Sequence, residues 1–297
     1  MKTPLIIAVA GKKLSGKTTL CKYLSAFYAL HMNYPKWDLV LYQDADGIIS
    51  ARHKVDGALL PVFLGKSLDF DREPAITYSF ATVLKSSVCT DVLGLTFEQT
   101  CGTNEEKNTL TPYFWDNLPL EIRKECSNEW EDICVGFSQI ETDESGINPD
   151  VEFIEKVKKP RIGPMTAREV MQVVGTNLFR RYFSDRVWVD ATFRLIQSQK
   201  PAIAFIADCR FKSEVDAVIQ AGGYVIQLTR NISPGDIHQS EIDLDDYQFE
   251  KLGNHCLVIN NQDKPISCKN EIALNWFTKL MDEQRKNNAG NTTVDKV

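Results

Sequence analysis

The sequence predicts a three-layer α/β fold with a mainly parallel sheet of about five strands, and three observations support this prediction. Short, continuous apolar runs, as at residues 5–10 and 202–207, are typical of strands that are buried on both faces of a parallel sheet. Apolar residues at helical spacing follow the first run, including Leu20, Leu24 and Phe27. A glycine-containing loop joins that run to the helix. This order of elements favours one sheet that is covered by helices on both faces.

The loop at residues 11–18, with the sequence GKKLSGKT, fits the pattern G-x-x-x-x-G-K-[ST] at every fixed position. Glycines let the backbone N–H groups point inward at phosphates, and the positive end of the following helix lies behind them. Lys17 would reach the β- and γ-phosphates of a nucleoside triphosphate, and Thr18 would place its hydroxyl on Mg²⁺. The pattern therefore predicts a P-loop NTPase fold. The expected residues of the ATP phosphate site are Gly11, Ser15, Gly16, Lys17, Thr18 and Thr19.

The composition argues against several classes of protein. Among 297 residues, 34 are Lys or Arg and 40 are Asp or Glu, so the formal net charge is −6. A protein that binds duplex nucleic acid or a membrane surface normally has a basic stripe, so neither partner is expected. No apolar run approaches the roughly 18 residues of a membrane span, and the apolar start is too short for a signal peptide. We therefore expect a cytoplasmic protein.

The chain is expected to form a single P-loop domain over residues 1–285. Within it, residues 33–74 have the turn and strand pattern of a β-hairpin or meander, which we interpret as an insertion. Residues 95–163 are irregular and of mixed charge, which is typical of a lid that covers a bound acceptor. Residues 286–297 are polar and are predicted to be a disordered tail.

A carboxylate at the end of a predicted strand is a candidate residue of the Mg²⁺ site. Asp208 follows the apolar run 202–207 directly, and the carboxyl ends of parallel strands are where α/β folds bind their ligands. Asp208 is therefore expected to act on Mg²⁺, directly or through water.

A capping box that begins at Thr166 predicts the start of a helix. Arg168, Gln172 and Gly175 would share one face of that helix, and this face is too polar for a core. Thr176 follows directly. These residues predict either a solvated face or a surface that faces an anion.

Several short segments, in order and at their observed spacing, carry a resemblance to a known family. They are residues 11–18, Phe80-Ala81 with Leu84-Lys85, Gly102 with Lys107, 168–172 with Gly175-Thr176, 187–189, 208–211 with Glu214, Gly222-Gly223, and 238–241. With these segments the chain resembles the phage-type deoxynucleoside monophosphate kinases, a branch of the P-loop nucleoside monophosphate kinases. The resemblance spans most of the chain from residue 5 to about residue 260.

The resemblance implies transfer of the γ-phosphoryl group of ATP to the 5′-phosphate of a deoxynucleoside monophosphate, with Mg²⁺ required. It implies catalytic roles for Lys17, Arg210 and Asp208, with Thr18 and Asp208 toward the metal. The residues implied in binding the acceptor are Lys85, Arg168, Gln172, Thr176, Trp188, Arg210 and Glu214. Gly102 and Lys107 would belong to the lid. Which arginine binds the acceptor phosphate stays open.

The resemblance also implies a homodimer, as a family-level expectation, and a host-cell cytoplasm if the protein is phage-encoded. The sequence departs from the family in two respects. Asn177 stands where members commonly have an acidic residue, and the insertion at 33–74 is absent from shorter members. These departures leave the preferred base open, and with it the choice between deoxyribose and ribose.

Three other interpretations of the sequence remain. A related small-molecule kinase, of the animal-type phosphomevalonate kinase kind, has the same fold. An ATP-gated switch has the same Gly-Lys-Thr-Thr start and transfers nothing to an acceptor. A structural protein with a fortuitous loop would have no affinity for ATP.

Overall fold

We describe the protein from a computed structural model, which describes residues 4–33, 39–44, 48–55, 59–60, 75–138, 151–231 and 239–291. The chain divides into two compact units. The first unit combines Met1–Val83 with Asp185–Val297, and the second is Leu84–Ser184. The second unit contains the whole of the segment 95–163 for which the sequence predicts a covering role.

The first unit is built on a five-stranded sheet with the order β12-β11-β1-β10-β5. Its strands are β1 (Leu5–Ala10), β5 (Ala75–Tyr78), β10 (Ile203–Cys209), β11 (Tyr224–Leu228) and β12 (Cys256–Ile259). Each neighbouring pair in this sheet is parallel. The mainly parallel α/β fold is therefore confirmed.

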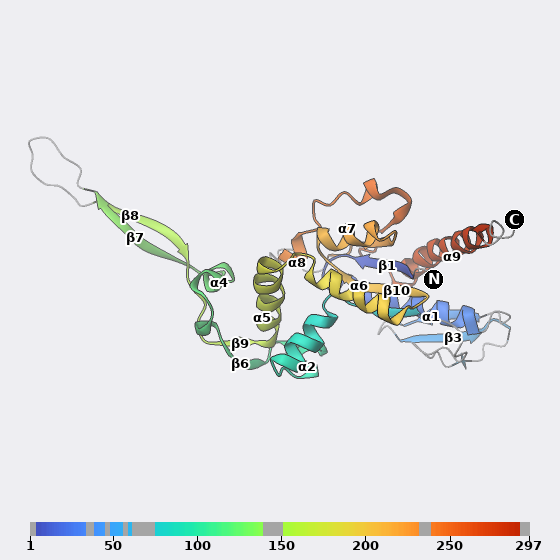
Figure 1. Cartoon of the computed structure of the whole chain (residues 1–297), viewed down its shortest axis with the longest axis horizontal. Helices are drawn as coiled ribbons and strands as arrows, with labels where there is room; N and C mark the ends of the chain where they lie inside the picture. The colour runs from blue at the N-terminus through green and yellow to red at the C-terminus, as the bar shows by residue number, and fades with distance from the viewer. Residues whose placement is uncertain are drawn as a thin grey trace, which may run out of the picture. The chain divides into compact units, whose positions relative to one another are not determined.

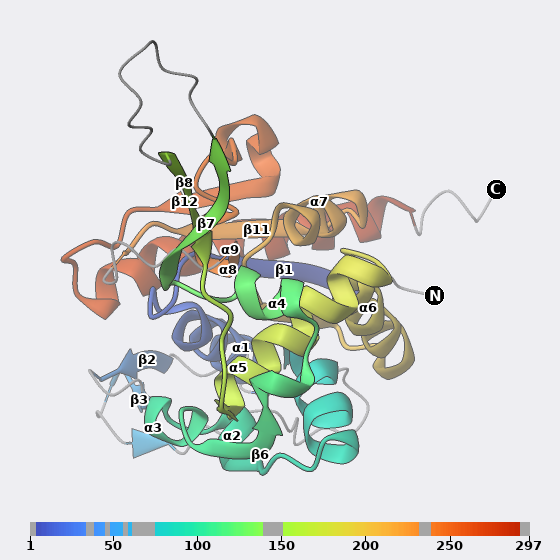
Figure 2. The ribbon, with the colours of Figure 1, turned by 90° about the vertical axis from the view of Figure 1, so that its left-hand side faces the viewer.

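Helices lie against both faces of this sheet, as Figures 1 and 2 show for α1 and α7. The longer helices of the unit are α1 (Lys17–Asn33), α6 (Val187–Gln199), α7 (Lys212–Gln220) and α9 (Ile266–Asn291). Alternate strand residues such as Ile7 and Phe205 pack in one core cluster with α1 and α9. Both faces of a strand must be apolar in this arrangement, which explains the continuous apolar runs of β1 and β10.

The predicted meander is confirmed as a separate antiparallel sheet, β2-β3-β4. Its strands are β2 (Leu39–Gln43), β3 (Ile49–His53) and β4 (Leu59–Leu60). Residues 34–38, 45–47, 56–58 and 61–74 of the predicted insertion lie outside the described residues. Gln43 ties this sheet to the main fold, because its side chain donates to the Thr19 carbonyl (3.4 Å) and accepts from Asn270 of α9 (2.8 Å).

The second unit consists of short helices and strands. They are η1 (Leu84–Val92), α2 (Phe97–Cys101), α3 (Asn104–Lys107), β6 (Leu110–Phe114), η2 (Trp115–Asn117), α4 (Leu120–Glu125), β7 (Trp130–Ser138), β8 (Val151–Lys158), β9 (Pro164–Thr166), α5 (Ala167–Gln172) and η3 (Val173–Arg180). Figure 1 shows β7 and β8 as a long antiparallel hairpin. The sequence predicts irregular structure over 95–163, whereas the structure has regular elements there. They are too short to give a periodic signal, and capping boxes at Thr96 and Thr103 start two of them.

The capping box at Thr166 begins α5 as predicted, with Glu169 as its reciprocal partner. The expected placement of Gly175 on a polar face is wrong, because Gly175 is buried. The chain changes at residue 173 from an α-helix to the π-helix η3, whose longer turn shifts every following side chain around the axis. A Cβ at Gly175 would lie 2.6 Å from Leu84 Cδ2, so glycine permits close packing of η3 on η1.

The last helix is longer than the sequence predicts. α9 continues to Asn291, past residue 286, where the polar composition predicts the start of a disordered tail. Extending an existing helix adds one backbone hydrogen bond per residue without a new nucleation step, so a polar segment can continue it. Residues 292–297 lie outside the described part of the chain.

Candidate functional site: an anion-binding loop and a cationic cluster

The predicted phosphate loop lies at the carboxyl end of β1, between the ends of its two neighbours, β10 and β11. This is the topological switch point of the sheet, because β5, the next strand of this sheet along the chain, lies on the β10 side of β1, whereas β11 and β12 lie on its other side. Gly11 (φ +143°) and Gly16 (φ +94°) have backbone angles that side chains disfavour. A Cβ at Gly11 would also lie 2.6 Å from the Leu228 carbonyl oxygen. Both glycines of the motif are therefore required by the backbone.

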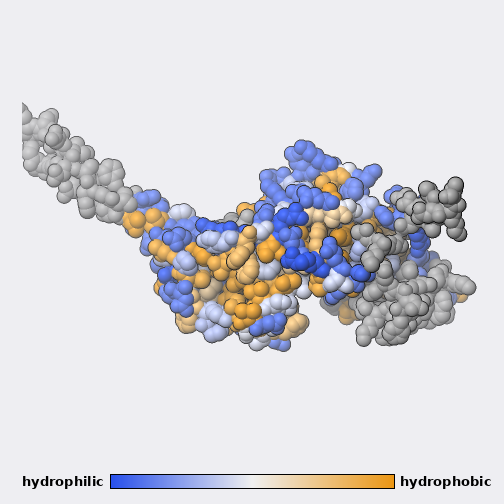
Figure 3. Space-filling view, viewed as in Figure 1, coloured by the Kyte–Doolittle hydropathy of each residue, from blue (hydrophilic) through white to orange (hydrophobic). Residues whose placement is uncertain are grey.

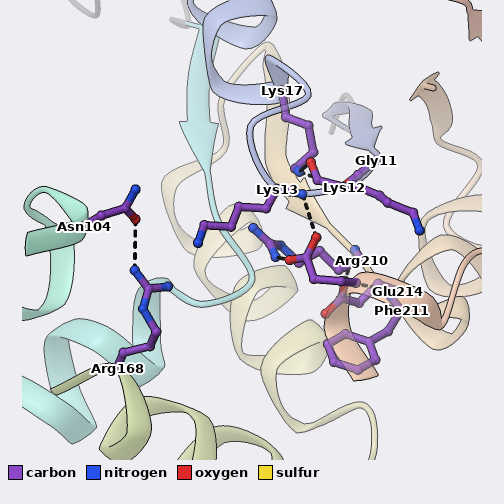
Figure 4. A network of polar contacts seen from close by, with 10 residues as sticks. Gly11, Lys12, Lys13, Lys17, Asn104, Arg168, Arg210, Phe211 and Glu214 are labelled. Carbon is purple, nitrogen blue, oxygen red and sulfur yellow. Dashed lines mark hydrogen bonds and ion pairs between the residues drawn. The ribbon is translucent and has the colours of Figure 1, made fainter. Parts of the chain in front are cut away.

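Lys17 is turned back onto its own loop, as Figure 4 shows. Its Nζ donates to the carbonyl oxygens of Gly11 and Lys12, each at 2.6 Å. The side chain is buried, and this burial, followed by the nearby Arg210 guanidinium, lowers the pKa of Lys17 to about 8. Within the described residues its hydrogen-bond partners are these two carbonyl oxygens, and an anion would stabilise a buried ammonium that is held by neutral groups.

The Ser15 hydroxyl supports the assignment of the loop to phosphate. Its Oγ is buried and has no hydrogen-bond partner within the described part of the chain. Leaving a buried hydroxyl unpaired costs about 1–3 kcal/mol, so a ligand that pairs with it is favoured. The loop also precedes α1, whose N-terminus attracts negative charge. Thr18 and Thr19 lie in the first turn of this helix, and Thr18 is exposed.

Asp208 has a structural role that the sequence does not reveal. Its Oδ1 accepts from the backbone N–H of Phe80 at 2.7 Å. Its Oδ2 accepts from the Ser79 hydroxyl and from the N–H of Ala81 at 3.2 Å. The carboxylate thus holds the end of β5 beside β10.

Thr18 and Asp208, the two residues expected to act on the metal, suit a Mg²⁺ ion that is bound mainly by phosphates and water. Mg²⁺ keeps several of its waters and commonly uses only one or two carboxylates of the protein. Thr18 is exposed, and Asp208 Oδ1 accepts only one of the hydrogen bonds above, so it can still accept from a metal-bound water. Among the described residues no cluster of three His, Cys, Asp or Glu side chains is placed to bind a metal.

Arg210 follows β10 directly and is held by two glutamates, of which Figure 4 labels Glu214. Its Nη1 forms an ion pair with Glu241 Oε1. Glu214 Oε2 accepts from the backbone N–H groups of Arg210 (2.7 Å) and Phe211 (3.1 Å). Glu214 is buried and lies in the first turn of α7, so it fixes the backbone from which Arg210 projects.

Two residues behind the loop were missed by sequence reasoning. Asn261 follows β12 and donates to the Ser15 carbonyl oxygen at 2.9 Å. Lys269, on α9, donates to the Gly16 carbonyl oxygen at 3.3 Å, and burial lowers its pKa to about 8. Neither belongs to a recognisable motif, so only the fold brings them to the loop.

The second unit brings three cations of the predicted site together. Lys85 lies on η1, Lys107 ends α3, and Arg168 lies in the first turn of α5. Burial, and then the positive charges of Lys85 and Arg168, lower the pKa of Lys107. Lys107 Nζ donates to the Gly102 carbonyl oxygen at 2.5 Å. The expected lid residue Lys107 thus shares one electrostatic environment with two expected acceptor residues.

Neutral side chains hold Arg168 in this cluster. Its Nε donates to Asn108 Oδ1 at 3.0 Å and its Nη2 to Asn104 Oδ1 at 2.9 Å. Figure 4 shows Arg168 facing Asn104. An amide orients a guanidinium without neutralising it, so the charge of Arg168 stays available to an anion. This differs from Arg210, which is paired with a carboxylate.

The other residues that the sequence predicts to bind the acceptor include residues of α5, η3 and α6. Gln172 is the last residue of α5 and Thr176 lies within η3, and both are partly exposed in the second unit. Trp188 is 4% exposed on α6 of the first unit. His238, in a segment that carries the resemblance, lies outside the described residues.

The five parallel strands, the helices around them and the loop after β1 are consistent with the fold of P-loop kinases. The chain is 33% identical over 95 residues to a protein of Acanthamoeba polyphaga mimivirus described as a "Putative deoxynucleotide monophosphate kinase". The match covers 27% of this chain and 47% of that protein, so the chain spans about half the length of the relative it matches. No protein-family model matches the chain.

None of the helices in the described part of the chain is both long enough and apolar enough to cross a membrane.

The structural role of Asp208 predicts a loss of stability in Asp208→Asn. An amide has one accepting oxygen, so it cannot accept at both positions. It loses either the Phe80 N–H or the Ser79 hydroxyl and the Ala81 N–H, which keep only their contact with each other. We expect a loss of about 1–3 kcal/mol in the free energy of unfolding, measured by urea denaturation. Asp190→Asn, on the surface of α6, is the control. An unfolding midpoint equal to that of the wild type would contradict the structural role.

Proposed function

We propose that the protein is a phage-type deoxynucleoside monophosphate kinase that transfers the γ-phosphoryl group of ATP to a deoxynucleoside 5′-monophosphate. The observation that carries the proposal is the loop after β1, with an unpaired Ser15 hydroxyl and a buried Lys17 ammonium. The similarity to the mimivirus protein supports a nucleotide as substrate, over the matched part of the chain.

The first unit supplies the donor site in this proposal. The loop N–H groups, the N-terminus of α1 and Lys17 bind the β- and γ-phosphates of ATP. Lys17 exchanges the carbonyl oxygens of Gly11 and Lys12 for phosphate oxygens. Mg²⁺, when bound near Thr18 and Asp208, neutralises phosphate charge.

The second unit supplies the cations for the acceptor phosphate. Arg168 carries an unneutralised charge in a fixed orientation, and Lys85 and Lys107 share its surroundings. A monophosphate dianion would relieve the mutual repulsion of these three cations. Gln172, Thr176, Trp188 and Glu214 are proposed to shape the base and sugar site, on the family resemblance alone.

The reaction needs positioning and charge neutralisation more than covalent chemistry. An oxygen of the acceptor 5′-phosphate attacks the γ-phosphorus, and the bond from that phosphorus to the β-phosphate oxygen breaks. ADP leaves with the bonding electrons, and the acceptor becomes a deoxynucleoside diphosphate. Lys17 and Arg210 stabilise the charge on the group in transfer.

We also propose a homodimer, because the family that the chain resembles implies one. Figure 3 shows apolar residues gathered on the surface of the second unit. Large apolar side chains of this unit with more than half of their surface exposed include Val92, Phe97, Leu110, Trp130, Ile162, Tyr182 and Phe183. Such surface favours association.

The direct test measures ADP formed from ATP and Mg²⁺ with each deoxynucleoside monophosphate in turn, with mevalonate 5-phosphate as a further acceptor. We expect ADP only when a deoxynucleotide is present, in amounts equal to the diphosphate product, and none above background in Lys17→Met. Lys13→Met is the control for loss of a loop lysine. ADP at one rate with or without acceptor would indicate an ATP-gated switch. Activity with mevalonate 5-phosphate alone would indicate the other kinase class.

The two arginines are expected to affect different kinetic constants. Arg168→Gln should raise the KM for the deoxynucleotide about 100-fold, because it removes a charge that binds the acceptor phosphate, with a smaller change in the KM for ATP. Arg210→Ala should lower kcat about 10³-fold, as expected for an arginine that stabilises the group in transfer.

Arg181→Gln is the matched control for Arg168, because Arg181 lies in the same unit and pairs with the exposed Glu125. It should leave both constants near those of the wild type. A rise in the acceptor KM in Arg210→Ala, with none in Arg168→Gln, would reverse the assignment of the two arginines.

The affinity for ADP should fall as the pH rises above about 8. The pKa of Lys17 is lowered to about 8 in the free protein, so its ammonium is charged below that pH and neutral above it. Phosphate favours the charged form, so affinity is lost by up to about tenfold per pH unit above the pKa. Calorimetric titration with ADP measures this, and Lys17→Arg should bind with little pH dependence because arginine stays charged. An equal decline in Lys17→Arg would assign the effect to another group.

A further inference from the structure

The carboxylate of Glu241 is bound to the groups that are expected to bind phosphate. Its Oε2 accepts from the backbone N–H of Lys13, within the loop, at 2.6 Å. Its Oε1 pairs with Arg210. A loop N–H group and a guanidinium are two of the kinds of donor that P-loop proteins offer to phosphate oxygens. In this structure a side chain of the protein itself takes both.

Glu241 is buried, with 6% of its side-chain surface exposed. A buried carboxylate is costly unless all of its charge is paired, and among the described residues this one pairs with one cation and one N–H group. A nucleotide phosphate offers more negative charge to the same donors. The contact is therefore of a kind that a stronger anion can replace.

Three acidic residues that follow Glu241 in the sequence contact Lys12 and Lys212 of the first unit. Asp245 pairs with Lys12 of the loop at 2.8 Å. Asp243 Oδ2 accepts from the N–H of Lys212, and Asp246 pairs with the Lys212 ammonium at 2.8 Å. The two lysine pairs are more exposed than the Glu241 contact, with half or more of the surface of Asp245 and Asp246 open to solvent. Such pairs contribute little, so Glu241 is the main anchor of this acidic segment, residues 241–246.

We propose that Glu241 is an internal anion that occupies the place of a phosphate oxygen in the nucleotide-free protein, and that bound nucleotide displaces it from Lys13 N and Arg210. This rests on the proposed function in that the loop must bind phosphate, but it requires no acceptor. The exchange lowers the affinity for nucleotide, because part of the binding free energy is used to displace the carboxylate. It also releases Arg210 only when a donor phosphate is present.

The first experiment compares Glu241→Gln with Asp245→Asn by calorimetric titration with ADP and Mg²⁺. Both variants change the net charge by the same amount and both lie on the acidic segment. Glutamine keeps the shape of the side chain and removes the charge that competes with phosphate. We expect ADP to bind Glu241→Gln about tenfold more tightly than the wild type, and Asp245→Asn within about twofold.

Two results of this titration would overturn the proposal. Weaker or unchanged binding in Glu241→Gln would mean that Glu241 only positions Arg210 or the loop. An equal gain in Asp245→Asn would mean that overall charge, and not the Glu241 contact, sets the affinity.

A second measurement needs no variant and covers the case in which Glu241→Gln does not fold. Hydrogen exchange of the wild-type protein is followed with and without saturating ADP. Displacement of Glu241 predicts slower exchange for loop residues 11–18 and faster exchange for residues 241–247. Slower exchange in both segments would overturn the proposal.

The two proposals fail in different ways. If the wild type transfers phosphate to a deoxynucleotide but Glu241→Gln binds ADP no more tightly, only the proposed displacement of Glu241 is wrong. If ADP binds and displaces Glu241 but no acceptor is phosphorylated, the kinase assignment is wrong and the proposed displacement of Glu241 is still supported. If ADP does not bind at all, both are wrong.

Discussion

The burial of the Lys17 ammonium at the ends of three parallel strands is the constraint on which the first unit depends. Parallel strands end together at one edge of the sheet, so the loop after β1 lies beside the residues that end β10 and β11. A second cation, Arg210, lies close enough to lower the pKa of Lys17. This positive charge is offset by two carboxylates, because the Glu241 and Asp208 charges both act on Lys17.

Those two carboxylates do different things. Asp208 accepts from the end of β5, so its position is set by two backbone N–H groups and by the Ser79 hydroxyl. Glu241 is engaged with a loop N–H group and a guanidinium, which are also groups that phosphate would use. One carboxylate is therefore part of the framework, and the other pairs with groups that we propose to bind phosphate. A residue count or a net charge would treat the two alike.

In the second unit, neutral groups hold the cations of the cluster. Arg168 is held by the amide oxygens of Asn104 and Asn108, which orient a guanidinium and leave its charge intact. Lys107 is held by a carbonyl oxygen of Gly102. Two long π-helices, η1 and η3, belong to this unit, and such helices occur often at functional sites. The π-helix η3 also explains why a period of 3.6 residues wrongly places Gly175 on a polar face.

The sequence by itself determined what depends on neighbours along the chain: the strand, loop and helix around residues 11–18, the glycines with positive φ, the capping box at Thr166 and the apolar runs of the sheet. The tertiary structure alone decided which distant groups meet these elements. Glu241 lies 228 positions from Lys13, and Asn104 lies 64 positions from Arg168. Such contacts depend on strand order and on how short elements fold back, and local periodicity and spacing carry no record of either.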